Sequence, residues 1–136
     1  MVLHDYCSDM YFDTLYEKIY CLIRSADFPK SNAILSKAEG TFKFKDHFRI
    51  LFKSLRCLLI VLENAPDTGI ENAANYIENI AIPKLIKTYA YTYVDEYCKI
   101  LSDYFKANDC YSRSTSLLET ALEIQRKMFY YRRNAV

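Results

Sequence analysis

The sequence predicts an all-α protein, a compact bundle of about six helices with repeat-like antiparallel helical hairpins. Apolar residues recur at intervals of three and four along most of the chain, and no segment alternates polar and apolar residues as a strand does. The chain of 136 residues holds only two glycines and three prolines, which fall between the periodic segments or at their ends. With 51% hydrophobic and 15% aromatic residues it is too apolar to remain disordered. Its length suits a single domain, 1–136.

The first two helices are predicted from apolar spacing and from residues typical of helix ends. Residues 9–24 place apolar side chains on one stripe and carboxylates on another, with Ser8 or Asp9 as the expected N-cap. A proline then opens the second helix, 29–39, and Gly40 follows in the position of a C-terminal cap.

The third predicted helix, 43–64, changes character along its length. Its first half is amphipathic and turns a basic stripe outward. The stripe consists of Lys45, Arg49, Lys53 and Arg56. Its second half, 57–62, reads CLLIVL and is apolar on every side, which is typical of a helix at the centre of a core.

Three further helices complete the bundle. Thr68 and Glu71 have the spacing of a capping box ahead of a fourth helix, 69–80. A proline opens or kinks a long fifth helix, 83–106, and an Asn-Asp pair separates it from the sixth, 111–131.

Charge, cysteine content and apolar run length restrict the class of protein. A formal net charge of +1 gives no whole-molecule argument for binding nucleic acid or an anionic membrane. The five cysteines are odd in number and widely spaced, so we expect reduced thiols rather than a disulfide framework or a zinc site. The first ten residues lack the features of a secretory signal, and the longest apolar run, 57–62, is too short to span a membrane. We therefore expect a cytoplasmic or nuclear protein without a membrane partner.

The residues that carry most enzyme chemistry are scarce or badly placed. With glycine only at 40 and 69 there is no phosphate-binding loop and no nucleophile elbow. His4 and His47 are the only histidines, and we expect His47 to be a solvated surface residue. The acidic ladder Asp9, Asp13 and Glu17 lacks the Glu-x-x-His partner of a dicarboxylate metal site. The sequence therefore predicts a protein that is not an enzyme and that uses no cofactor or metal.

The tyrosine content of this chain is unusual, with thirteen tyrosines and no tryptophan. Four tyrosines are predicted to share one face of the helix 83–106, namely Tyr89, Tyr93, Tyr97 and Tyr104. Tyrosine is enriched at protein–protein contacts because its ring is apolar and its hydroxyl is polar. The pattern therefore indicates either a tyrosine face that binds a partner or a tyrosine-lined edge of the core. The segment RKMFYYRR at 126–133 mixes aromatic and basic residues, either as single-strand binders do or to finish an apolar stripe.

Residues 95–128 resemble a tetratricopeptide repeat, a helix–turn–helix unit of 34 residues. Leu101, Phe105 and Tyr111 stand where the family has its first-helix leucine, an aromatic residue and the turn aromatic, and ALEI at 121–124 matches its second-helix pattern. Ser102, Ser114 and Arg126 depart from it, because the family has glycine, alanine and commonly proline at these positions. The resemblance implies stacked helical hairpins that bind other proteins. A vaguer likeness, of composition alone, is to the small all-α proteins of large DNA viruses, which often have the apoptosis-regulator fold.

These observations favour a non-catalytic adaptor or scaffold module. It would bind a peptide or a partner helix through the tyrosine face, with the basic stripe steering an acidic partner. It would act as a subunit of a larger complex or as a homo-oligomer. Two alternatives stay open: a nucleic-acid-binding helical protein that uses the stripe at 43–56, and a viral helical-bundle modulator of host apoptosis or innate signalling.

Overall fold

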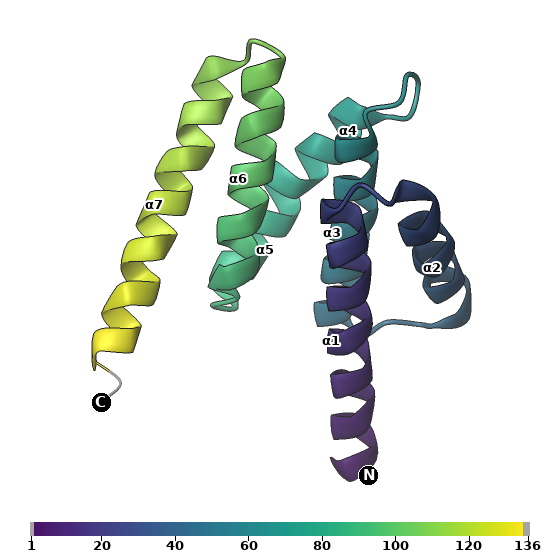
Figure 1. Cartoon of the computed structure of the whole chain (residues 1–136). Coiled ribbons are helices and arrows are strands. Elements are labelled where there is room, and N and C mark those ends of the chain that lie inside the picture. Colours follow the sequence, from purple (N-terminus) through teal and green to yellow (C-terminus); the bar gives the residue numbers. More distant parts are fainter. Residues whose placement is uncertain (1, 135–136) are drawn as a thin grey trace. The chain divides into compact units, whose positions relative to one another are not determined.

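A computed structural model describes the backbone of residues 2–134 and the side chains of residues 9–130. Throughout that part of the chain the regular structure is helical, which confirms the all-α prediction (Figure 1). The elements are α1 (Val2–Arg24), α2 (Phe28–Thr41), α3 (Asp46–Glu63), α4 (Ile70–Tyr76), the π-helical turn η1 (Ile77–Ala81), α5 (Ile82–Lys87), α6 (Tyr91–Ala107) and α7 (Tyr111–Asn134). They form two compact units, an N-terminal unit (Met1–Ala73) and a C-terminal unit (Ala74–Val136), and each is described by itself.

A cluster of phenylalanine rings fills the N-terminal unit, where α1, α2 and α3 pack on one another. Phe12 of α1 has three rings within 5.1 to 5.4 Å of its centroid, those of Phe42, Phe44 and Phe48. Phe44 also stacks on Phe52 with centroids 4.4 Å apart. Edge-to-face pairs of this kind add to the energy that area burial alone provides. The predicted centre at 57–62 is confirmed in its larger part, since four of its six side chains are buried.

The predicted limits of the first three helices are partly wrong. Backbone hydrogen bonding in α1 begins at Val2, so neither Ser8 nor Asp9 is an N-cap. Gly40 lies inside α2, whose C-cap is the extended residue Phe42. Glycine tolerates a helical backbone when the surrounding packing favours it, so its presence does not oblige a helix to end.

The predicted boundary between the fourth and fifth helices is also wrong, because α4, η1 and α5 follow one another without a break. Within η1 the Ile82 N–H bonds to the carbonyl of Ile77, five residues earlier. Pro83 has no N–H and its ring crowds the preceding turn of a regular helix, and the wider π turn relieves that crowding. The break comes instead at residues 88–90, so the predicted helix 83–106 is two helices. The prediction of Thr68 as the cap of the fourth helix is wrong as well. Helix α4 begins at Ile70, and the hydroxyl of Thr68 donates to the Ala65 carbonyl.

The C-terminal unit is dominated by an antiparallel hairpin of α6 and α7 (Figure 1). Side chains of both helices are buried along the seam, among them Leu101, Phe105 and Ala121. Ser102 and Ser114 face each other across the seam, with their Oγ atoms 2.7 Å apart, and each hydroxyl also lies within hydrogen-bond distance of the other residue's carbonyl. Two of the three departures from the tetratricopeptide pattern are therefore partners. Helix α5 packs on α6 as well.

Four of the described helices end on a left-handed residue that is not glycine, and Asn64 after α3 is one of these residues. After α1, α5 and α6 the backbone forms the paired hydrogen bonds of a Schellman motif, with Ala26, Tyr89 and Asp109 at φ near +60°. After α5, for example, the N–H groups of Tyr89 and Ala90 bond to the carbonyls of Ile86 and Leu85. Glycine is the residue that most often occupies this position, because a Cβ makes the conformation costly.

Candidate functional site

The four tyrosines predicted to share a face do not do so. Tyr89 lies in the turn at 88–90 and is 71% exposed, whereas Tyr97 on α6 is fully buried at 0%. Tyr93 and Tyr104 are half-buried. Tyr97 is therefore a core residue, and its ring is not accessible to a partner. The reason is the break after α5, which removes Tyr89 from the helical register that the other three residues follow.

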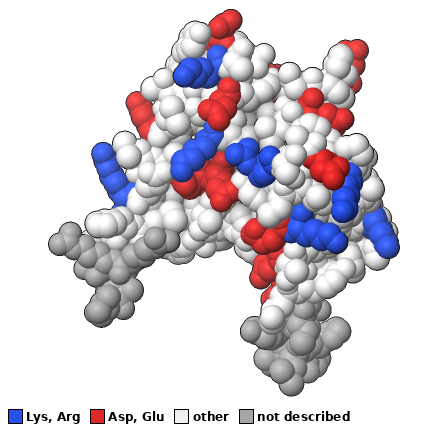
Figure 2. Space-filling model, viewed as in Figure 1, with Lys and Arg blue, Asp and Glu red and all other residues white. Residues whose placement is uncertain are grey.

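The basic stripe is largely engaged within the N-terminal unit. Arg56 of α3 reaches across to α2, where it donates to Asn32 Oδ1 at 2.6 Å, to the hydroxyl of Ser36 and to both carboxylate oxygens of Glu39. Arg49 pairs with Asp46, one turn away on α3. Lys45 and Lys53 are exposed. On the face shown in Figure 2 acidic and basic side chains are interspersed rather than gathered by sign.

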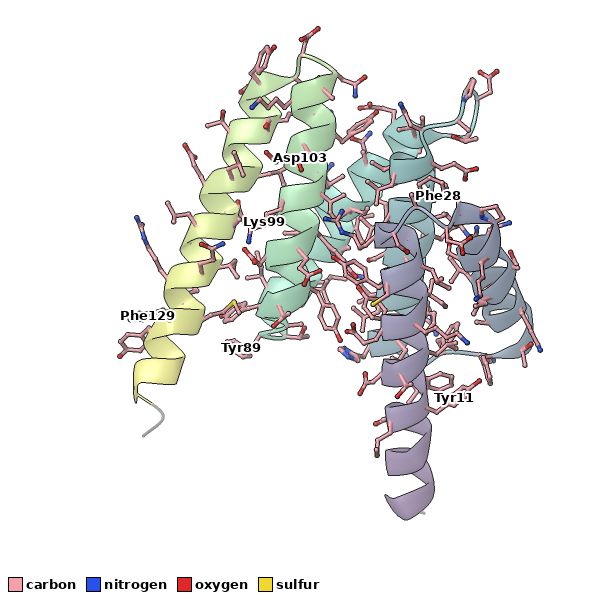
Figure 3. All side chains as sticks on the ribbon, in the orientation of Figure 1. Tyr11, Phe28, Tyr89, Lys99, Asp103 and Phe129 are labelled. Atoms are coloured by element: carbon pink, nitrogen blue, oxygen red, sulfur yellow. The ribbon has the colours of Figure 1, made fainter. Side chains whose placement is uncertain are left out.

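A hollow that the sequence did not reveal lies where the turn at 88–90 approaches the second half of α7. We call it the tyrosine hollow, and its walls are Tyr89, Tyr91, Glu123, Arg126, Lys127 and Tyr130. Tyr89 and Tyr91 meet edge to face with centroids 6.0 Å apart. Figure 3 shows Tyr89 close to the first turn of α6. The signal for half of this site was present in the RKMFYYRR segment, but nothing local linked it to residues almost forty positions earlier.

A second hollow, the aliphatic hollow, lies between α7 and the segment formed by η1 and α5. Its apolar walls include Ile82, Ile86 and Leu117. At its edge Arg113 of α7 donates to Glu78 of η1 at 2.9 Å and to Asn75 of α4 at 2.8 Å. The same guanidinium sits 3.9 Å above the centroid of the Phe105 ring. These contacts hold α7 against the η1 segment and fix the width of the hollow.

Both hollows use the same flank of α7. Their α7 residues recur at intervals of three and four, as in Ser116, Thr120, Glu123, Lys127 and Tyr130. From Ser116 to Tyr130 the helix rises by about 21 Å, which is the length of an extended peptide of about six or seven residues. The flank is thus long enough for a peptide or a short helix.

The combined lining of the two hollows has an excess of positive charge. Its charged residues are four basic and two acidic ones, namely Lys87, Arg113, Arg126, Lys127, Glu78 and Glu123. Both carboxylates have a basic neighbour within the flank, Arg113 for Glu78 and Lys127 for Glu123 at 3.7 Å. A ligand with acidic groups therefore suits this surface better than a basic one.

The thiols and the described histidine show no arrangement for catalysis. Burial raises the pKa of the Cys57 thiol to about 11 and that of Cys98 to about 12, so both stay protonated at neutral pH. His47 is exposed as predicted, with its ring edge against Phe48. Among the described residues no three potential metal ligands cluster. The side chains of His4 and Cys7, and those beyond residue 130, lie outside the described part.

None of the described helices combines the length and the apolar character needed to cross a lipid bilayer. Comparison with known proteins gives no match to a family model, to a curated protein or to a solved structure. The tetratricopeptide resemblance therefore rests on residues 95–128 alone.

Proposed function

We propose that the chain is a non-catalytic protein-interaction module of the adaptor or scaffold type, which binds an acidic peptide segment along the flank of α7. The tyrosine hollow would hold an aromatic or aliphatic side chain of the ligand, and Arg126 and Lys127 would meet its carboxylates. The tetratricopeptide-like hairpin and the predicted cytoplasmic or nuclear location belong to the same proposal. The four cysteines among the described residues are free thiols, which fits such a compartment.

One observation carries the proposal, the backbone conformation of Tyr89. A left-handed backbone at φ +60° costs a residue with a side chain about 1 kcal/mol or more, and glycine would avoid that cost. The side chain there is large, aromatic and 71% exposed, so packing inside the fold does not account for it. Strained residues that present an exposed side chain are concentrated at binding sites.

Because the left-handed backbone at Tyr89 is costly, one substitution there should change peptide binding and stability in opposite directions. Tyr89→Gly removes the proposed anchor and also relieves the backbone, so we expect the free energy of unfolding to rise by about 1 kcal/mol while peptide binding falls at least tenfold. Asp109→Gly is the matched control, because it relieves the same conformation at the end of α6 and touches neither hollow. It should gain similar stability and keep full binding.

Selection from a peptide library identifies the sequences that the flank binds. A library of random peptides, about twice as long as the flank can hold, is panned on the immobilised full chain, and the enriched peptides are resynthesised with a fluorophore for anisotropy titrations. We expect enrichment of acidic sequences whose affinity for wild type falls as salt rises. Peptides that bind Tyr89→Gly as tightly as wild type, or a selected set without acidic residues, would refute the proposal.

The nucleic-acid alternative has weaker support. It relied on the basic stripe, in which Arg56 and Arg49 are paired with acidic side chains of the chain itself. The apoptosis-regulator alternative stays a prediction from composition.

A further inference from the structure

Helix α7 carries an exposed apolar stripe that neither hollow uses. Leu118, Leu122 and Phe129 are 51%, 49% and 64% exposed, and Tyr111 extends the series toward the start of the helix. These four residues, the α7 stripe, recur at intervals of seven, four and seven. Figure 3 shows Phe129 projecting from the side of α7 that faces away from α6. Apolar residues in this rhythm form the seam of a helix that pairs with another helix.

The stripe and the peptide-binding flank share one residue, Arg126, which lines the tyrosine hollow and stands beside Leu122 on the helix. At 100° per residue, Leu122 and Lys127 point about 140° apart around the helix axis. A bound peptide and a second copy would thus lie on different sides of α7 and share only this arginine. Large apolar side chains exposed in one row are also costly to leave in water, which favours a partner.

The charges beside the stripe point to a particular occupant. Glu119 and Arg126 are both exposed and stand seven residues apart along the same edge of the stripe. In a parallel pair the twofold axis runs along the helices and turns this edge of one copy toward the opposite edge of the other, so Glu119 and Arg126 would not meet their counterparts. If they paired antiparallel about a twofold axis between residues 122 and 123, Glu119 would face Arg126 of the second copy, and the reverse pair would form by symmetry.

The apolar residues agree with the same axis. It brings Leu122 next to Leu122 of the second copy. It also leaves Leu118 offset by about 3 Å along the helix from Phe129 of the second copy, given a rise of 1.5 Å per residue. The stripe is thus self-complementary in charge and in shape in the antiparallel arrangement.

We propose that α7 pairs antiparallel with α7 of a second copy to form a symmetric homodimer through the α7 stripe. A contact made mainly by one helix pair belongs to the smaller interfaces, below about 1,200 Å², so we expect a dissociation constant in the micromolar range. This inference goes beyond the peptide-binding function and does not depend on it.

Sedimentation velocity over a wide range of concentrations tests the stripe. Wild type should pass from monomer to dimer in the micromolar range, and Leu122→Glu should raise the dissociation constant at least tenfold. Ile80→Glu is the matched control, because Ile80 is also an exposed apolar residue of the C-terminal unit, on η1, and should leave dimerisation unchanged. Circular dichroism verifies that both variants keep the helical content of wild type. A wild type that stays monomeric, or a Leu122→Glu variant that dimerises normally, would overturn the inference.

Charge exchange tests the orientation. Glu119→Arg places two basic residues opposite each other in the antiparallel dimer, and Arg126→Glu places two acidic ones, so each variant alone should be largely monomeric. Mixed in equal amounts, they regain both opposite-charge pairs and should form a heterodimer. In a parallel pair neither single change would weaken association, since these two residues do not face each other across that interface. Singly changed variants that associate as wild type does, or a mixture that stays monomeric, would contradict the antiparallel dimer, whatever the outcome of the peptide titrations.

Discussion

In the N-terminal unit the guanidinium of Arg56 fastens α3 to Asn32 and Glu39 of α2, and in the C-terminal unit Arg113 fastens α7 to Asn75 and Glu78. Each arginine thus joins two helices through one amide and one carboxylate. The planar fork of a guanidinium suits this task because it can donate to several acceptors at once.

The carboxylates of the two clamps differ in exposure, whereas the side chains of Arg113 and Arg56 are 34% and 26% exposed, in the opposite order. Glu78 is 20% exposed and Glu39 is 39% exposed. Arg113 also covers the ring of Phe105, whereas no aromatic ring is recorded beneath Arg56 among the described residues. The comparison shows that a row of basic residues along one helix does not identify a binding surface, since its members can serve as internal ties.

The interiors of the two units differ as well. Among the described residues each unit buries one tyrosine and two serines, but the serines differ in their partners. Ser31 and Ser54 of the N-terminal unit donate to carbonyls of their own helices. In contrast, Ser102 and Ser114 bond to each other across the α6–α7 hairpin. Buried polar groups must be satisfied by hydrogen bonds, so they restrict how the surrounding helices can pack. Because the serine pair of the C-terminal unit bonds across the hairpin, it restricts how α6 and α7 pack, and the same unit holds the tyrosine hollow and the aliphatic hollow.

Removing one large core side chain from each unit should produce the largest effects. Phe52→Ala and Tyr97→Ala should each lower the free energy of unfolding by about 3–5 kcal/mol, because each leaves a cavity at a fully buried site. Urea titration followed by far-UV circular dichroism measures the loss. The exposed Tyr130→Ala should change stability by less than about 0.5 kcal/mol.

The same titrations test the predicted single domain, 1–136. If the two units unfold as one, both variants move a single transition to lower urea by similar amounts. Two separated transitions, each moved by only one of the variants, would show instead that the units are independent domains.

Much of the fold follows from apolar spacing alone. The periodic rows identified every helical segment, and the row at 57–62 correctly marked buried residues such as Leu58. Helix ends were less predictable. Gly40 was expected to end a helix and does not, whereas Tyr89 ends one in a conformation that usually requires glycine. Gly40 continues the helical backbone of α2, and the paired hydrogen bonds of the Schellman motif hold Tyr89, so in both cases a local preference worth about 1 kcal/mol is overridden.

The candidate site was only partly predictable for the same reason. The importance of tyrosine was anticipated, but assigning the residues to one face required an unbroken helix from 83 to 106. A break of three residues separates Tyr89 from that face and places it near Tyr130, which is distant in sequence. The acceptors of Arg56 on α2 were equally hidden, because contacts between helices are not encoded in the spacing within either one.

The two arginine clamps should differ in their contribution to stability. Arg113→Ala should cost about 2–3 kcal/mol, because it leaves the partly buried Glu78 without its guanidinium. Arg56→Ala should cost less, about 1–2 kcal/mol, because water can reach Glu39 more easily. Urea titrations of both variants measure the difference. Arg113→Lys keeps the charge and loses the fork, so its cost should fall between zero and that of Arg113→Ala. A greater loss from Arg56→Ala would reverse our ranking of the clamps.

The serine pair of the α6–α7 hairpin should give modest single losses of stability that are not additive. Ser102→Ala or Ser114→Ala removes one hydroxyl and leaves the other without its closest partner in a buried seam, at a cost of about 1–2 kcal/mol. The double variant removes both hydroxyls and restores apolar small residues on both helices, so its stability should lie closer to wild type than the sum of the single losses. Ser102→Gly combined with Ser114→Ala recreates the tetratricopeptide pattern and should also fold, at the cost of one glycine inside α6. Additive losses across this cycle would mean that each serine acts through other neighbours. Strong compensation would show that two departures from a common pattern persist because each makes the other tolerable.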